Sequence, residues 1–276
     1  INLLQALYHV NPVRIDIGGT VDSIRQITKE LLYTCYGTFY HPQNMAVFAV
    51  GDFDAEAVLE QVRRDAADRS HARREEISRS YPDEPPGVRE HRVEDELVIS
   101  RPRLALGFKD RTVGLSGEAL LRRELATNVV LRLCLGRSSP LFSRLYDLGL
   151  IDDHFSGRYS GAVRFGHTVI SGETPDPERL YEELITGLER LRQEGVRRDD
   201  FERVRRQYIG SFLDAFNSLE FIANGFLSNH FRGISLFDYV EAVDALTLDE
   251  LNARLQEHFD RGQAAVSILW PKGKRG

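Results

Sequence analysis

The stretch VDSIRQITKELLYTCYGTFYHPQNMAVFAV, residues 21–50, is the most informative part of the chain, because its pattern returns near the other end at a constant offset and without a gap. The second copy occupies residues 240–269. Ten positions carry the same class of side chain in one register, which is more than amphipathicity alone supplies to two unrelated helix–strand units. The sequence therefore predicts a domain-sized internal repeat. The matched pairs are Val21/Val240, Asp22/Glu241, Ile24/Val243, Ile27/Leu246, Thr28/Thr247, Glu30/Asp249, Leu32/Leu251, Tyr40/Phe259, Ala46/Ala265 and Val47/Val266.

Everything between the two copies occurs only once, so the first copy lacks whatever should precede its last helices and strand. A chain that begins at Ile1 and has Met45 as its only methionine fits this expectation. We therefore expect a truncated domain followed by a complete domain, with a superposable helix and strand in each. The apolar strand of the truncated copy would lack neighbours, and we expect it to be partly disordered or covered by a second chain.

The bulk composition is that of a globular protein, with 42% hydrophobic and 28% charged residues in 276. No apolar run approaches the roughly 18 residues of a membrane helix. A formal net charge of -6 argues against a nucleic-acid partner, since the Arg-rich stretches interleave acids at helical spacing and are typical of solvated helix faces. A regulatory or nucleic-acid-binding module would rest on those stretches alone. Cys35 and Cys134 show no metal-knuckle or disulfide spacing, which favours a reducing, cytoplasmic compartment.

The first part of the chain alternates helix and strand. Thr28 is expected to cap a helix that ends before His41 and Pro42, followed by a buried strand over 45–50 and a charged helix over about 55–68. A cluster of Pro and Gly residues then marks a linker. We therefore expect residues 1–70 to be the C-terminal remnant of a first domain, residues 71–90 a linker and residues 91–276 a second domain.

The second part places strands before a block of helices. Strand patterns cover 91–99, 103–110, 153–163 and 166–174, and helical patterns cover 118–135 and 139–148. Asp176 and Pro177 begin another helix, Asp199 begins a long helix that continues through Leu219 and Ile222, and Thr247 with Glu250 forms a capping box before a last helix and strand. This order predicts an α+β fold, in which an antiparallel sheet is covered on one face by helices.

Residues 11–54 resemble a signature stretch of the insulinase (pitrilysin-like) family of zinc metallopeptidases. Residues 138–155 and 171–180 resemble the following domain of the same family, especially in bacterial processing-peptidase members. The resemblance thus covers nearly the whole chain, and it implies α+β domains duplicated within each half. The elements that carry the first match are Pro12, Arg14, Gly19–Thr20, Ser23–Ile24, Thr28, Tyr40, Pro42, Asn44–Met45 and Val50–Phe53.

The resemblance implies zinc for the full-length parent but not for this chain. The family binds zinc through an inverted H-x-x-E-H motif and a further Glu, and that motif belongs before the first residue here. No two of the eight His residues have the i,i+4 spacing that aims two imidazoles at one ion. Asp152, Asp153 and His154 come nearest to a metal constellation, but consecutive residues on a strand alternate faces. We predict no catalytic and no metal residue in this chain.

A second family feature is an Arg and a Tyr, in the pattern L-R-x-x-x-G-L-x-Y, that hold the substrate backbone. The corresponding stretch departs from this pattern, because Tyr146 stands in the Arg position and Asp152 in the Tyr position. Arg144 is the side chain that could substitute from a neighbouring position. Arg144, Tyr146 and Asp152 are therefore the substrate-contacting candidates.

These observations lead to two functional hypotheses. In the first, the chain is the C-terminal segment of an insulinase-family zinc peptidase, walls the substrate chamber for peptides and cleaves nothing by itself. In the second, it is a non-catalytic partner subunit of a heterodimeric family peptidase, which the altered clamp positions favour. The expected partner is the missing N-terminal half or a second family subunit, with a homodimer as a further possibility; neither hypothesis involves nucleic acid or a membrane.

Overall fold

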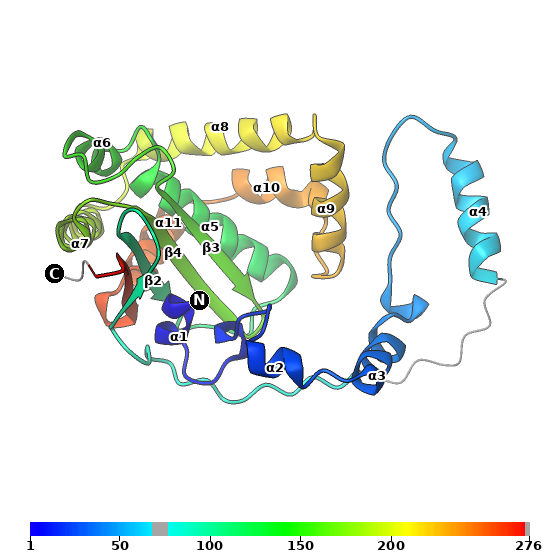
Figure 1. Cartoon of the computed structure of the whole chain (residues 1–276). Coiled ribbons are helices and arrows are strands. Elements are labelled where there is room, and N and C mark those ends of the chain that lie inside the picture. The colour runs from blue at the N-terminus through cyan, green and yellow to red at the C-terminus, as the bar shows by residue number, and fades with distance from the viewer. Residues whose placement is uncertain (68–76, 274–276) are drawn as a thin grey trace.

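The computed structural model describes residues 1–67 and 77–273, which form a body and an arm (Figure 1). The body consists of residues 1–14 and 81–273, and residues 77–80 lead back to it from beside the arm. The arm, residues 15–67, leaves the body and extends away from it, with its last helix standing apart. Residues 71–76 of the predicted linker lie outside the described residues.

The body is built on one sheet in which β5 lies between β1 and β2. The strand order is β1-β5-β2-β4-β3, and β2 pairs antiparallel with both β4 and β5. The expectation of an α+β fold with an antiparallel sheet under helices is confirmed, with one difference. The chain enters β5 last and inserts it between two strands of opposite direction, so β5 is antiparallel to β2 and parallel to β1. The strands are β1 Arg92–Leu97, β2 Arg103–Lys109, β3 Ser156–Ala162, β4 Phe165–Glu173 and β5 Ala264–Pro271.

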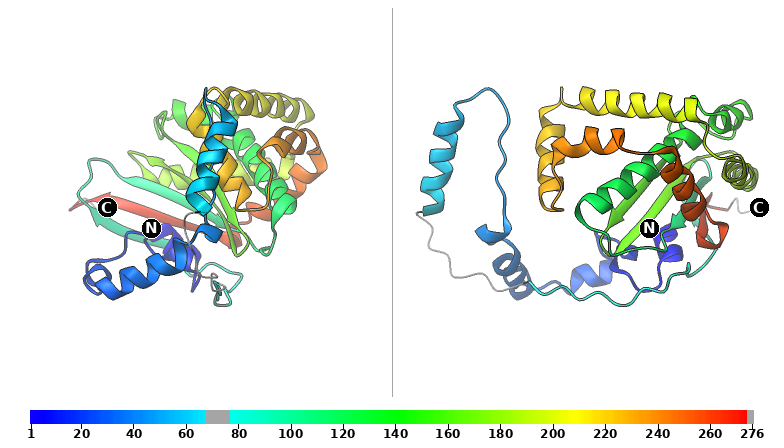
Figure 2. Two further views of the ribbon diagram at one scale, coloured as in Figure 1. Left: turned by 90° about the vertical axis from the view of Figure 1, so that its right-hand side faces the viewer. Right: turned by 180° about the vertical axis from the view of Figure 1, so that it is seen from behind.

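One face of the sheet carries the main core and is covered by helices (Figure 2). Alternate residues of β2, Leu104, Leu106 and Phe108, are buried in this core. Helix α5 crosses it with ten buried residues and contacts β3 and α11. The helices of this layer are α5 Gly117–Leu135, α6 Pro140–Asp147, α7 Pro177–Glu194, α8 Arg198–Ala215, α9 Leu219–His230, α10 Tyr239–Asp244 and α11 Leu248–His258.

Two predicted helix caps are confirmed. Asp199 is not an N-cap, because α8 begins at Arg198 after Arg197, and the long helix predicted from it is two helices. Asp176 caps α7 by accepting a hydrogen bond from Arg179 N, and Thr247 with Glu250 forms the capping box of α11. The long helix from Asp199 through Ile222 was a wrong prediction, because α8 ends at Ala215 and α9 begins at Leu219. Ser218 accepts a hydrogen bond from Phe221 N, and such local side-chain bonds compete with a continuous helix.

The other face of the sheet is partly covered by helix α1, Asn2–Leu7 (Figure 2). Leu3, Ala6 and Leu7 form a small separate core with Tyr8 and Ala265 of β5. Gly107 makes this contact possible, since a Cβ there would lie 2.8 Å from Leu7 Cδ1. Helix α1 thereby joins the N-terminus to the sheet.

The two copies of the repeat share their local structure. Helix α3, Lys29–Phe39, and α11 are each capped by a threonine, and each is followed by a 3-10 turn, η2 Pro42–Asn44 and η4 Arg261–Gln263. The second copy then forms β5, whereas the predicted strand over 45–50 does not form. Those residues are extended, but among the described residues no strand lies beside them to complete a ladder. The remaining arm helices are α2 Val21–Arg25 and α4 Ala55–Ala67.

Candidate functional site

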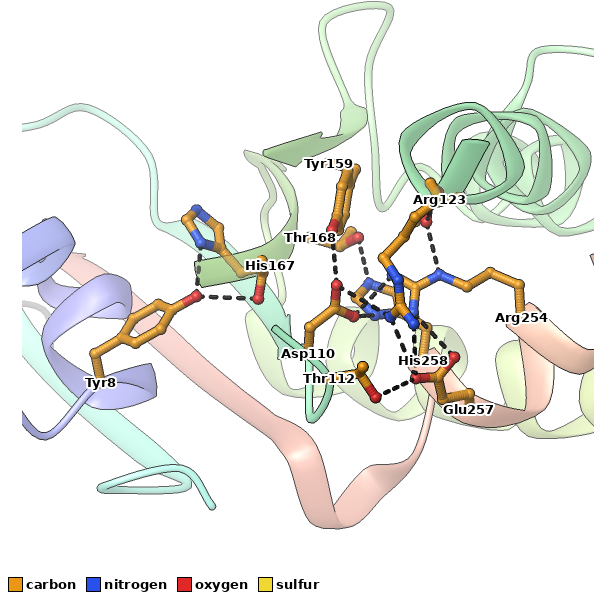
Figure 3. Close-up of polar contacts among 12 residues, drawn as sticks. Tyr8, Asp110, Thr112, Arg123, Tyr159, His167, Thr168, Arg254, Glu257 and His258 are labelled. Atoms are coloured by element: carbon orange, nitrogen blue, oxygen red, sulfur yellow. Dashed lines mark hydrogen bonds and ion pairs between the residues drawn. The ribbon is translucent and has the colours of Figure 1, made fainter. Parts of the chain in front are cut away.

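A buried polar cluster lies where β2 ends and α11 crosses the sheet (Figure 3). We call it the Asp110 cluster and define it as Asp110, Tyr159, Thr168, Arg254 and His258. Asp110 follows β2, Tyr159 and Thr168 stand on β3 and β4, and the other two stand on α11. All five side chains are buried. The cluster therefore joins three strands to the last helix of the repeat.

The Asp110 carboxylate is the centre of this cluster. Its Oδ1 accepts from Arg254 Nη2 at 2.7 Å and lies 2.6 Å from His258 Nδ1, and its Oδ2 accepts from Tyr159 at 2.7 Å. An ionised carboxylate only accepts, so His258 carries its proton on Nδ1 and accepts from Thr168 Oγ1 through Nε2, at 2.6 Å. Every polar atom of the imidazole is thus satisfied.

A second layer of charge surrounds the cluster. Arg254 Nε donates to Thr127 Oγ1 at 2.7 Å, and Arg123 lies 3.6 Å from Asp110 Oδ2. Glu257 balances these cations from the surface, at 3.2 Å from Arg123 and 3.4 Å from Arg254. Two guanidinium groups therefore face one buried carboxylate, and a second carboxylate, that of Glu257, completes the neutralisation.

The protonation states follow from these contacts. Burial alone would raise the pKa of Asp110, but the hydrogen bond and charge of His258 and the charge of Arg254 outweigh it and hold the pKa well below its usual range. Burial, followed by the charge of Arg254, lowers the pKa of His258, and burial beside Asp110 raises the pKa of Tyr159. At neutral pH the cluster is an ionised aspartate with a neutral histidine and a neutral tyrosine. The side chains of the cluster hydrogen-bond to one another. The cluster therefore holds β2, β3, β4 and α11 together and does not exchange protons with a substrate.

The Asp110 cluster does not fit a zinc ion. Both nitrogens of His258 are engaged by Asp110 and Thr168, and two guanidinium groups lie against the carboxylate that a cation would need. Over residues 1–67 and 77–273, no group of three or more His, Cys, Asp and Glu residues could hold a metal ion. The described part of the chain therefore supplies no site for the zinc that the family resemblance implies for a parent protein.

The three substrate-contacting candidates do not share one surface depression. Arg144 of α6 binds Glu183 of α7 through two hydrogen bonds of 2.7 and 2.8 Å and lines a depression of about 590 Å³. Tyr146, on the same helix, is half exposed and stacks on Phe142. Asp152 lies in the loop before β3, accepts from His154 N at 2.9 Å and lines a different depression of about 620 Å³. The structure thus brings Arg144 and Tyr146 onto one helix but places Asp152 elsewhere.

Sequence reasoning missed the Asp110 cluster. Its five members are spread from residue 110 to residue 258, and nothing in their spacing predicts that they meet. One signal was present: Arg254 and His258 occupy the same helical stripe as Leu251 and Leu255, four buried positions on one face of α11. Two charged or titratable residues on a core-facing stripe indicate a buried partner, because such groups are rarely buried unpaired.

The arm presents an exposed apolar surface. Helices α2 and α3, whose residues are all described, bury none of their side chains. In the extended segment after them, Phe48 stacks on Phe226 of α9 with ring centroids 4.4 Å apart, whereas Met45 and Val47 point outward and are exposed. The exposed large apolar side chains of this arm surface are Ile15, Ile17, Val21, Ile24, Ile27, Leu31, Leu32, Tyr33, Tyr36, Phe39, Tyr40, Met45, Val47, Phe53 and Leu59.

Comparison with known proteins places this geometry in a family. Residues 26–208 match the family described as the peptidase M16 inactive domain. The chain is 37% identical over 270 residues to the uncharacterized zinc protease YmfH of Bacillus subtilis, covering 98% of this chain and 63% of that protein. It is 24% identical over 274 residues to the zinc protease PqqE of Helicobacter pylori, covering 96% and 59%.

Solved structures agree with this match. The chain superposes on an M16-like peptidase structure from Alicyclobacillus acidocaldarius with a TM-score of 0.94 and 35% identity, over 98% of this chain and 64% of the other. It superposes on a protease from Helicobacter pylori with a TM-score of 0.80 at 19% identity, over 98% and 65%, which shows the shared fold. This chain spans less than two thirds of the length of each of these four proteins.

Proposed function

This chain belongs to the M16 peptidase family and carries the region described as its inactive domain, and from this premise we propose that it walls the substrate chamber of a zinc-dependent peptidase whose metal-bearing part lies elsewhere. In this proposal the chain binds and positions peptide substrates and cleaves none by itself. The zinc, held by the other part, would supply the activated water. The residues of this chain would shape the chamber around the peptide.

The exposed apolar surface of the arm carries this proposal. Fully burying one large apolar side chain stabilises a protein by roughly 1.5–3 kcal/mol, and the arm exposes many of them on consecutive elements. Monomeric proteins rarely expose apolar patches of this extent unless the patch meets a partner. The segment over 45–50 is extended and apolar on both faces, which suits a strand within a sheet supplied by the partner. We infer that the metal-bearing part packs against the arm.

Two finer assignments belong to the proposal. The division into a metal-domain remnant (1–70), a linker (71–90) and a chamber-wall domain (91–276) is kept, with α1 of the first part docked on the sheet of the last. Arg144, Tyr146 and Asp152 remain the candidates for contact with substrate. Arg144 would have to leave Glu183 to bind a substrate carbonyl, so its role depends on how firmly that exposed ion pair is held.

The setting of the protein is also a proposal. No helix in the described parts of the chain is long and apolar enough to cross a membrane. Cys35 is exposed and Cys134 is buried, both as free thiols, which supports a reducing, cytoplasmic environment. The formal net charge of -6 supports a protein partner and peptide substrates rather than nucleic acid.

The alternative function, a non-catalytic subunit beside an active family subunit, is supported by one observation. Tyr146 and Asp152 occupy the positions at which the family pattern has Arg and Tyr, and they do not line a common depression with Arg144. A subunit without a clamp could still complete a chamber. An active family subunit on the arm surface would be the simplest such arrangement.

A reconstitution assay tests the proposal. The chain is incubated with a peptide library alone, with zinc, and with a separately produced family segment that carries H-x-x-E-H. We expect chelator-sensitive cleavage only in the third mixture. Cleavage that is chelator-sensitive in the first two would contradict the proposal, and a mixture that cleaves no faster than the metal-bearing segment alone would do so too.

Leu32→Asp in the same assay tests whether the exposed apolar surface of the arm binds the metal-bearing segment. Leu32 is 60% exposed on the arm and Val98 is 92% exposed in the turn between β1 and β2, so Val98→Asp is a matched control. We expect Leu32→Asp to weaken assembly by at least about tenfold, since it places a charge in an apolar contact. Val98→Asp should assemble like the parent. Equal effects of the two changes would show that assembly does not depend on the arm surface.

A further inference from the structure

The two segments that connect the arm to the body meet at the end of strand β2. The outgoing root, residues 8–14, follows α1, and the return root, residues 81–90, leads into β1. Lys109, the last residue of β2, lies between them on the face that α1 covers, opposite the main core. The roots are distant in sequence, so this meeting point is a feature of the fold.

Lys109 holds the return root. Its side chain is only 3% exposed, and its ammonium donates all three hydrogens, to Glu84 Oε1 at 2.6 Å, Pro85 O at 2.7 Å and Gly87 O at 2.7 Å. The same ammonium lies 5.0 Å from the ring centroid of Tyr8, in the outgoing root. A buried ammonium with no spare donor fixes the path of the three residues that it binds.

Glu84 holds the outgoing root. Its Oε1 accepts from His9 N at 2.8 Å, and its Oε2 accepts from Val10 N at 2.9 Å and Asn11 N at 2.7 Å. Three consecutive backbone amides therefore converge on one carboxylate. Hydrogen bonds to a charged group are about twice as strong as neutral ones, so this contact fixes the direction in which the chain leaves the body.

Further bonds on each side keep the roots in register. Ala6 O accepts from Arg89 N at 2.9 Å and Glu90 N at 3.0 Å, which ties α1 to the start of β1. Asn11 Nδ2 donates to Arg164 O at 3.0 Å in the turn between β3 and β4. A chain held at one root can swing about that root, whereas one ion pair that holds both roots restrains this swing. The stack of Phe48 on Phe226 is a further contact between the arm and the body.

We propose that the Lys109–Glu84 pair is the joint that sets the orientation of the arm relative to the sheet. Lys109 and Glu84 are positioning residues, since they act through the backbone of the two roots. The inference rests on the proposed function only in taking the arm as the surface against which the metal-bearing part packs. In that setting the joint aligns the metal-bearing part with the chamber wall.

The experiment measures orientation in the full chain, without any peptidase assay. Spin labels are placed on Cys35, exposed in α3, and on Gln207→Cys, exposed in α8, and the distribution of distances between them is recorded. Lys109→Met removes the joint. Arg103→Met is the matched control, because Arg103 stands on the same strand and the same face in an exposed ion pair with Glu173.

We expect a narrow distribution in the parent and in Arg103→Met, and a broad one in Lys109→Met. Hydrogen exchange at His9, Val10 and Asn11 should become at least about tenfold faster, since their acceptor is no longer held in place. A folded Lys109→Met chain with a narrow distribution and unchanged exchange overturns the proposal.

Glu84→Gln covers the case in which Lys109→Met does not fold. It keeps an acceptor and removes the charge, so it is the milder change. A broadened distribution with a retained circular-dichroism spectrum supports the joint, and the parent distribution overturns it. None of these measurements involves cleavage. A result that refutes the joint therefore leaves the chamber-wall proposal to be tested separately by the reconstitution assay.

Discussion

His258 Nδ1 lies 2.6 Å from Asp110 Oδ1, and neither side chain is exposed to solvent. The contact joins the last turn of α11 to the end of β2. The joint at Lys109 lies at the same end of β2, on the opposite face of the sheet. Asp110 and Lys109 are neighbours whose side chains serve the two faces of the sheet. The described chain thus uses one end of β2 to anchor both the second copy of the repeat and the arm.

The buried histidines make the body sensitive to acid. Burial lowers the pKa of His258 and lowers that of His167 to about 4, whereas an imidazole in the unfolded chain takes up a proton below about pH 6.5. The unfolded state then binds more protons, so the free energy of unfolding should fall as pH drops from about 6.5 toward 4. Urea unfolding at pH 7, 5.5 and 4.5 measures this fall. The step from pH 7 to 5.5 isolates the histidines, because carboxylates such as Glu84, whose pKa is lowered to about 2, begin to lose stability only as the pH nears their ordinary value of 4.5. Equal stability at the three pH values would contradict the assignment of neutral, buried histidines.

The Asp110 cluster should contribute far more stability than a surface ion pair. Asp110→Asn leaves Arg254 and His258 without their charged partner, and removing one member of a buried pair costs about 3–5 kcal/mol. Asp260→Asn is the control, since Asp260 pairs with Arg111 at 2.5 Å on the surface and its loss costs less than about 1 kcal/mol. Chemical denaturation of both variants checks the difference. If Asp110→Asn lowers the free energy of unfolding by less than about 1 kcal/mol, the cluster does not hold these elements together.

The packing of α1 on the sheet depends on the absence of a side chain at residue 107. Gly107→Ala places a Cβ 2.8 Å from Leu7 Cδ1 and 3.0 Å from Leu3 Cδ2, and such overpacking costs about 1–3 kcal/mol. Gly210→Ala is the matched change, because a Cβ there meets nothing within 4 Å on α8 and should raise stability by up to about 1 kcal/mol. Thermal unfolding compares the two. Opposite signs are expected, and a neutral Gly107→Ala would mean that α1 is not packed as described.

The repeat shows how far the sequence could predict the fold. Tyr40 and Phe259 occupy matched positions and end their helices with nearly the same backbone, φ -87° and ψ 47° against φ -90° and ψ 36°. Caps and turns depend on local sequence, which is why they were predictable from the pairing of residues 21–50 with 240–269. The strand over 45–50 depends on neighbours that its own sequence does not contain, and there the prediction was wrong.

The site was less predictable than the fold for the same reason. The Asp110 cluster and the Lys109–Glu84 joint each combine residues far apart in the chain, and only their polar character on core-facing positions could have indicated them. Arg144, Tyr146 and Asp152 were chosen from a family pattern. Their contact with substrate stays a prediction, which Arg144→Ala in the reconstituted peptidase can test through the KM for peptides.

Hydrogen exchange of the arm, with and without the metal-bearing family segment, tests the central claim most directly. We predict fast exchange over α3 and residues 45–50 in the chain alone, because α3 is exposed and the segment over 45–50 is in no ladder. Adding the metal-bearing segment should slow exchange over both stretches by at least about tenfold, while α5 stays protected throughout. If exchange over α3 and residues 45–50 is the same in the two samples although the metal-bearing segment is folded, the arm surface is not where that part binds, and the chamber-wall account is contradicted.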